Sequence, residues 1–84
     1  MGRAKRHIPK RLAEKLLKIR ERSGLSMSEL VEKLGSEDIP LYKSDISKYE
    51  AGMREPPLVI LLRYAKLGKV SVESLIDDEL DINL

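Results

Sequence analysis

The sequence predicts an all-α fold, a compact domain of five helices. Apolar residues recur at the three- and four-residue spacing of amphipathic helices, whereas the strict alternation of a half-buried strand is rare. Gly, Ser and Pro interrupt the chain at short intervals, as they do at helix ends. Because 84 residues leave room for one core only, we expect a basic arm at residues 1–8, a helical domain at 9–76 and an acidic tail at 77–84.

The first helix is predicted from Pro9, because proline suits the first turn of a helix. Leu12, Leu16 and Ile19 follow at positions i, i+4 and i+7 and form one apolar face. Gly24 is expected to end this helix in the left-handed conformation that glycine adopts without steric cost.

The second helix is predicted to begin after Ser26 with a capping box. In this motif the Ser26 hydroxyl accepts the N–H of Glu29, and the Glu29 carboxylate accepts the N–H of Ser26. Gly35 is expected to end the helix. Its predicted buried stripe is Met27, Leu30, Val31 and Leu34.

The third helix is expected at about residues 43–51, after a polar connector at 36–41. Ile46 and Tyr49 are three positions apart and turn inward. The opposite, exposed face then carries Lys43, Ser44, Ser47 and Lys48.

Two more helices and a tail complete the chain. Pro57 opens the fourth helix, and Ser71 caps a short fifth helix. The predicted core face of the fourth helix is Leu58, Leu61, Leu62 and Ala65. In the tail, alternating apolar residues fit an extended segment laid on the surface: Leu80, Ile82 and Leu84.

Charge is unevenly distributed along the chain, although the formal net charge is only +2. Residues 1–22 hold nine Lys or Arg against two Glu, and residues 70–84 hold five acidic residues and no basic one. This asymmetry fits a protein that turns its basic side toward a polyanion and its acidic end away. From the pattern alone, it is an equally good interpretation that these charged segments are only exposed to solvent and bind no partner.

Several classes of protein are disfavoured by composition. The chain has no Cys and a single His, His7, so we expect no disulfide, no metal site and no cofactor. No apolar run approaches the ~20 residues that span a bilayer, and no signal-peptide core follows the basic N-terminus. We therefore expect a cytoplasmic protein without membrane contact. We expect no enzyme, because neither Ser44 nor Ser47 has a base other than His7.

Four segments in order resemble the phage-repressor, or Xre/Cro-type, helix-turn-helix family: SMSEL at 26–30, ISKYEAG at 46–52, REPP at 54–57 and VSVESLI at 70–76. The resemblance covers residues 9–76 and implies a repressor-like DNA-binding domain, with the helix-turn-helix at its second and third helices. The sequence departs from the family in two places. The connector is about five residues longer than the usual tight turn, and Met27 stands where Gln is common.

The resemblance implies that the third helix enters the DNA major groove. Lys43 and Lys48 would then donate to guanine, and Asp45 would accept from cytosine. For Asp45, capping of the third helix is an equally weighted alternative, and Ser44 is the other candidate cap. The predicted base-reading residues are Lys43, Ser44, Asp45, Ser47 and Lys48.

Contacts with the DNA backbone are expected from the start of the second helix, from the loop after the third and from the arm. The arm follows the backbone, enters the minor groove or serves solubility alone. For Arg54 the alternative is an ion pair with Glu55. The predicted backbone residues are Met27, Ser28, Gly52, Met53, Arg54, Arg3, Lys5, Arg6, Lys10 and Arg11.

Two structural contacts are also predicted. By resemblance, Arg20 pairs with Glu50 and ties the recognition helix to the scaffold. Val59 and Ile60 fall outside the predicted core face of the fourth helix, and exposed apolar residues mark partner surfaces. We therefore expect a homodimer interface at Val59, Ile60, Leu80 and Ile82.

Together these observations predict a sequence-specific double-stranded DNA-binding protein that acts as a transcriptional regulator, and specifically as a repressor. One alternative is the antitoxin of a toxin–antitoxin pair, which binds DNA and also a protein partner through its acidic tail or fourth helix. Another is a protein-interaction module that kept the fold and lost DNA binding. The lysines of the third helix argue against this last alternative.

Overall fold

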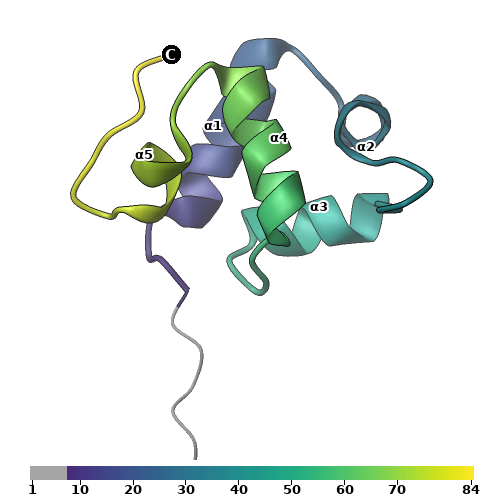
Figure 1. The fold of residues 1–84 in the computed structure, drawn as a ribbon, viewed down its shortest axis with the longest axis horizontal. Helices are drawn as coiled ribbons and strands as arrows, with labels where there is room; N and C mark the ends of the chain where they lie inside the picture. Colours follow the sequence, from purple (N-terminus) through teal and green to yellow (C-terminus); the bar gives the residue numbers. More distant parts are fainter. Residues whose placement is uncertain (1–7) are drawn as a thin grey trace, which may run out of the picture.

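The computed structural model describes residues 8–84, which form five helices (Figure 1). The first helix contacts α3, α4 and α5, and α2 packs against α3 and α4. Across this part of the chain there is no strand, and none of the helices is long and apolar enough to cross a membrane. The helices are α1 (Leu12–Ser23), α2 (Met27–Leu34), α3 (Lys43–Glu50), α4 (Leu58–Gly68) and α5 (Val72–Ile76).

The core takes side chains from every helix, which confirms the all-α prediction. Leu16 and Ile19 of α1 lie at its centre and are fully buried. Fully buried residues from the other helices are Leu30, Ile46, Ile60, Tyr64 and Leu75. One core therefore holds all five helices, and the position of α3 depends on its packing against α1 and α2.

The local signals for helix ends are confirmed. Gly24 follows α1 with φ of 70°, in the left-handed region. The Glu29 N–H donates to the Ser26 hydroxyl at 3.1 Å, and the Ser26 N–H donates to the Glu29 carboxylate at 2.8 Å. Hydrogen bonding of the Glu29 carboxylate to Ser26, first of all to its backbone N–H, lowers the pKa of Glu29. Ser71 caps α5 by accepting the N–H of Ser74 at 3.0 Å.

The start of α1 differs from the prediction, because the helix begins at Leu12 and not at Pro9. The tail supplies the cap. The two carboxylate oxygens of Asp78 accept the N–H groups of Lys10 at 2.9 Å and Arg11 at 3.0 Å. Negative charge at a helix N-terminus is favourable, so the acidic end lies beside the basic start of the domain and is not turned away from it.

The predicted core face of α4 is confirmed for Leu61 and Ala65 and wrong for Leu58 and Leu62. Ile60, predicted as exposed in a dimer interface, is fully buried, whereas Leu58, predicted in the core, is 81% exposed. The buried face is Ile60, Leu61, Tyr64 and Ala65. Five consecutive apolar residues at 58–62 do not define which side of a helix faces inward, and the side that is buried is the one that also carries Tyr64. Burial raises the pKa of the Tyr64 hydroxyl, which has no hydrogen-bond partner within residues 8–84.

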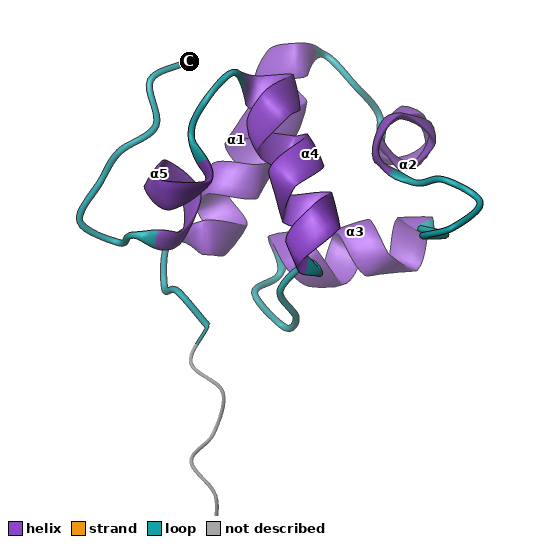
Figure 2. Cartoon of the chain, in the orientation of Figure 1, coloured by secondary structure: helices purple, strands orange, loops and turns teal. Residues whose placement is uncertain are grey.

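The long connection between α2 and α3 forms neither helix nor strand (Figure 2). Leu41 is buried and anchors its end. From α4, the guanidinium of Arg63 donates to the carbonyl oxygen of Leu34 at 2.7 Å and so holds the end of α2. The end of the loop passes close to Gly35, where an added Cβ would lie 3.0 Å from the Leu41 Cβ atom and 3.3 Å from the Leu41 backbone nitrogen. These contacts fix the loop that leads into α3.

Candidate nucleic-acid interface

The outer face of α3 presents polar and cationic side chains to solvent. Ile46 and Tyr49 point into the core, which confirms the predicted orientation of the helix. The exposed residues are Lys43, Ser44, Ser47 and Lys48. The structure therefore brings four of the five predicted base-reading residues together on one accessible face, and the fifth, Asp45, is half-buried.

The predicted ion pair between Arg20 and Glu50 is confirmed, with both carboxylate oxygens engaged. Arg20 donates from Nε at 2.7 Å and from Nη2 at 3.1 Å. The Glu50 side chain is only 8% exposed and that of Arg20 20%. The hydrogen bond to Glu50 raises the pKa of Arg20. Since Arg20 also donates to the carbonyl oxygen of Leu25 at 3.2 Å, one side chain links α1, the turn before α2 and the end of α3.

Asp45 organises the start of α3. One carboxylate oxygen accepts the N–H of Tyr42 at 2.9 Å, which confirms the capping alternative. The other accepts from Arg54 at 3.2 Å, an ion pair that the sequence did not predict. Both oxygens of Asp45 are therefore occupied, and the pair connects the first turn of α3 to the loop that follows it.

The backbone amides predicted to bind phosphate after α3 are used within the helix end. Gly52 adopts φ of 75°, and its N–H donates to the Tyr49 carbonyl oxygen at 3.2 Å. The Met53 N–H donates to the Lys48 carbonyl oxygen at 2.9 Å. This pair of bonds is a Schellman motif, which satisfies the last carbonyl groups of a helix. The Arg54 side chain remains accessible from this loop, at 52% exposed.

The first turn of α2 holds Met27 and Ser28. Ser28 is exposed, whereas Met27 is half-buried and packs against the core. Only Ser28 therefore presents its side chain fully to a ligand, and a contact between Met27 and phosphate would have to use its backbone.

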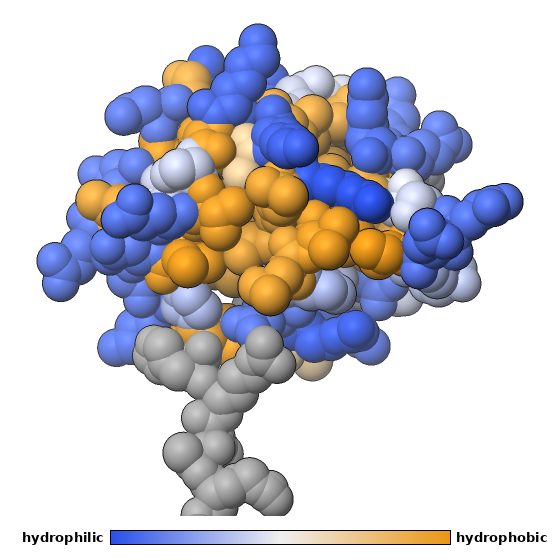
Figure 3. Space-filling view, viewed as in Figure 1, coloured by the Kyte–Doolittle hydropathy of each residue, from blue (hydrophilic) through white to orange (hydrophobic). Residues whose placement is uncertain are grey.

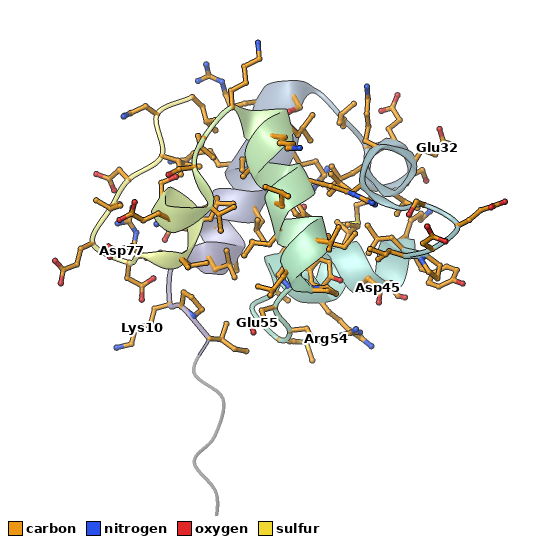
Figure 4. All side chains as sticks on the ribbon, viewed as in Figure 1. Lys10, Glu32, Asp45, Arg54, Glu55 and Asp77 are labelled. Atoms are coloured by element: carbon orange, nitrogen blue, oxygen red, sulfur yellow. The ribbon has the colours of Figure 1, made fainter. Side chains whose placement is uncertain are left out.

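Arg11, predicted to contact the DNA backbone, is bound by the acidic tail instead. Its guanidinium donates to the Asp78 carbonyl oxygen at 3.0 Å and to the Asp81 carboxylate at 2.5 Å. The hydrogen bond from Arg11 lowers the pKa of Asp81. Lys10 is exposed, and Figure 4 shows it on the same side of the molecule as Arg54. The other predicted arm residues, Arg3, Lys5 and Arg6, lie outside the described residues.

Lys15 illustrates why the charge count overstated the basic surface. It is 1% exposed, and its ammonium group donates to the carbonyl oxygens of Ser74 at 2.7 Å and Asp77 at 3.0 Å. These are carbonyl groups at the end of α5, so Lys15 caps that helix. Burial of Lys15 could have been predicted from the sequence, because Lys15 lies between Leu12 and Ile19 on the apolar face of α1.

Comparison with known proteins identifies the domain. A family model described as helix-turn-helix matches residues 16–75, from the middle of α1 to the end of α5. No curated protein and no solved structure matches the chain. The matched segment is well over half of the chain and includes the exposed face of α3. The chain therefore belongs to the Xre/Cro-like helix-turn-helix family of DNA-binding regulators.

Proposed function

We propose that this protein is a sequence-specific repressor that inserts α3 into the major groove of double-stranded DNA. The observation that carries the proposal is the exposed face of α3, which combines cations and hydroxyl groups on a helix held rigidly by the ion pair of Arg20 and Glu50. The major groove is about 12 Å wide and admits a helix. A fixed helix keeps its side chains in register with the base edges, as readout of sequence requires.

The side chains divide into three roles. Lys43 and Lys48 donate to guanine acceptors, and each good base contact contributes roughly 1–3 kcal/mol of discrimination. Arg54 binds a phosphate, because its exposed ion pair is worth little in water and exchanges readily for a phosphate contact. Asp45 accepts the Tyr42 N–H at the start of α3, and we assign it no base contact because its side chain is only 18% exposed.

The repressor acts as a homodimer through α4 and α5. Apolar side chains gather on the side of the molecule shown in Figure 3. A groove of about 320 Å³ lies between the start of α1, α4 and α5, with the exposed Leu58 and Ile76 among its lining. We propose that this surface, together with the exposed Val59 and Leu62, forms the dimer interface. It replaces the contact predicted at Ile60, which is buried. Two copies would then place their recognition helices at half-sites about 34 Å apart.

Leu58→Asp tests the dimer without disturbing the core, because the Leu58 side chain is 81% exposed. We expect the mass from light scattering to fall from two chains to one, with an unchanged circular dichroism spectrum. The surface proposed on α4 and α5 replaces the predicted dimer contacts of Leu80 and Ile82 in the tail. Leu80→Asp is therefore the matched control, and we expect it to leave the dimer intact. A wild-type mass of one chain at high concentration would exclude a dimer that forms without DNA.

Repression is preferred to the antitoxin function because the acidic tail is already engaged. Asp78 caps α1 and Asp81 binds Arg11, so these carboxylates are committed within the molecule. A basic toxin would have to displace both contacts. The remaining surface for a protein partner is the apolar one on α4 and α5, which we assign to the second copy.

Selection of duplexes from a random DNA library tests the function directly. Sequencing of the retained duplexes is expected to yield an inverted repeat, and a reporter gene with that repeat across its promoter is expected to lose expression when the protein is present. Retention without an enriched motif would refute specificity. Absence of retention at low salt would refute DNA binding by the isolated protein.

A further inference from the structure

Tyr42 is the one tyrosine that the fold leaves in solvent. Tyr49 and Tyr64 are both buried in the core, whereas Tyr42 is 63% exposed. It occupies the N-cap position of α3, directly before the exposed Lys43 and Ser44. A large aromatic side chain therefore lies at the end of the face that we assign to the major groove.

The backbone at Tyr42 is held on both sides. Its N–H donates to the Asp45 carboxylate at 2.9 Å, and its carbonyl oxygen accepts the Asp45 N–H at 2.9 Å. Leu41, immediately before it, is buried in the core. The ring therefore starts from a fixed point on a rigid helix, and with two side-chain torsions it loses little conformational entropy on binding.

We propose that the ring of Tyr42 reads a thymine by packing against its 5-methyl group. This inference rests on the proposed insertion of α3 into the major groove. In an intact duplex the faces of the bases are covered by their neighbours, so an aromatic ring meets base edges. The thymine methyl is the apolar group that the major-groove edges present. N-terminal residues of a recognition helix are the ones that reach those edges.

Deoxyuridine offers a direct test, because it keeps every hydrogen-bonding group of thymidine and lacks only the methyl. In the operator obtained by selection, each thymine would be replaced in turn, in both half-sites, and the Kd measured by fluorescence anisotropy. At one position the replacement should weaken binding of the wild-type protein by about three- to fivefold per half-site, the value expected for one buried methyl-sized group. For Tyr42→Ala the same replacement should have no effect.

Tyr42→Phe is the matched control, since it retains the ring and removes the hydroxyl. We expect it to bind as the wild type does and to keep the sensitivity to deoxyuridine. Equal loss of affinity in both variants would mean that the hydroxyl and not the ring makes the contact, and would overturn the inference; because a neutral hydroxyl releases no counter-ion, the salt dependence would stay unchanged in that case. Equal sensitivity of the wild type and Tyr42→Ala would overturn it as well.

Failure of this inference is distinguishable from failure of the proposed function. If the selection yields no operator, specific DNA binding itself is refuted. If an operator is bound tightly but no deoxyuridine substitution affects the wild type, α3 reads DNA without a methyl contact from Tyr42. Because Tyr42 is exposed, Tyr42→Ala is expected to fold, and its thermal unfolding would verify this.

Discussion

Glu50→Gln should destabilise the domain strongly, although the two side chains have nearly the same size. The carboxylate of Glu50 accepts two hydrogen bonds from Arg20, at 2.7 and 3.1 Å, in a largely buried site. Glutamine keeps one acceptor, but its amide group faces the donors of Arg20 and its charge is lost. The guanidinium then remains partly buried without a counter-ion.

The expected loss of stability is about 2–3 kcal/mol. Hydrogen bonds to charged groups contribute roughly 1.5–3 kcal/mol, and breaking a fully buried ion pair costs about 3–5 kcal/mol. The 20% exposure of the Arg20 side chain places this pair below the fully buried case. At about 0.05–0.15 kcal/mol per residue, a domain of this size has a free energy of unfolding of roughly 4–12 kcal/mol. The melting temperature should therefore fall by roughly 10–20 °C.

Urea unfolding followed by circular dichroism at 222 nm measures this loss, and the slope against urea should stay unchanged. In a double-mutant cycle with Arg20→Gln, the double variant should be more stable than the sum of the single variants by about 1–2 kcal/mol. Arg54→Gln is the control. It breaks the more exposed ion pair with Asp45 and should change stability by less than about 1 kcal/mol. A loss below about 0.5 kcal/mol for Glu50→Gln would refute the argument that this ion pair holds α3 in place.

Four further outcomes are expected. Arg54→Gln should weaken DNA binding evenly across sequences and reduce the log–log salt slope by about 0.9, as measured by titration at several salt concentrations. Lys48→Ala should instead relax the preference at one base position in a repeated selection. Gly35→Ala should cost about 1–3 kcal/mol in urea unfolding, because its Cβ would lie 2.9 Å from the Val31 carbonyl oxygen of α2 and 3.0 Å from the Leu41 Cβ atom at the end of the connector; a neutral result would contradict the close approach of the connector. The lowered pKa of Glu29 stabilises the folded state above pH 4.5, its ordinary pKa, and this stabilisation is lost as the pH falls through the lower folded value. Glu29→Gln should therefore unfold with a weaker dependence on acid than the wild type.

The features that followed from the sequence are the ones set by neighbouring residues. Gly24 ends α1 and the capping box of Ser26 and Glu29 starts α2, since each depends on bonds within a few positions. The family was visible in four short segments, and with it came the pairing of Arg20 with Glu50, 30 residues apart. The spacing of Ile46 and Tyr49 predicted which side of α3 faces the core.

Tertiary structure decided the rest. The side of α4 that faces inward depends on packing against α1, because a run of five apolar residues has no unique amphipathic phase and only the fold buries Ile60 while exposing Leu58. The partner of Arg11 lies 67 to 70 positions away, in a tail whose carboxylates reach α1 only after α5 has folded back. Local propensity carries no information about such contacts, since their geometry exists only once the core has brought distant segments together.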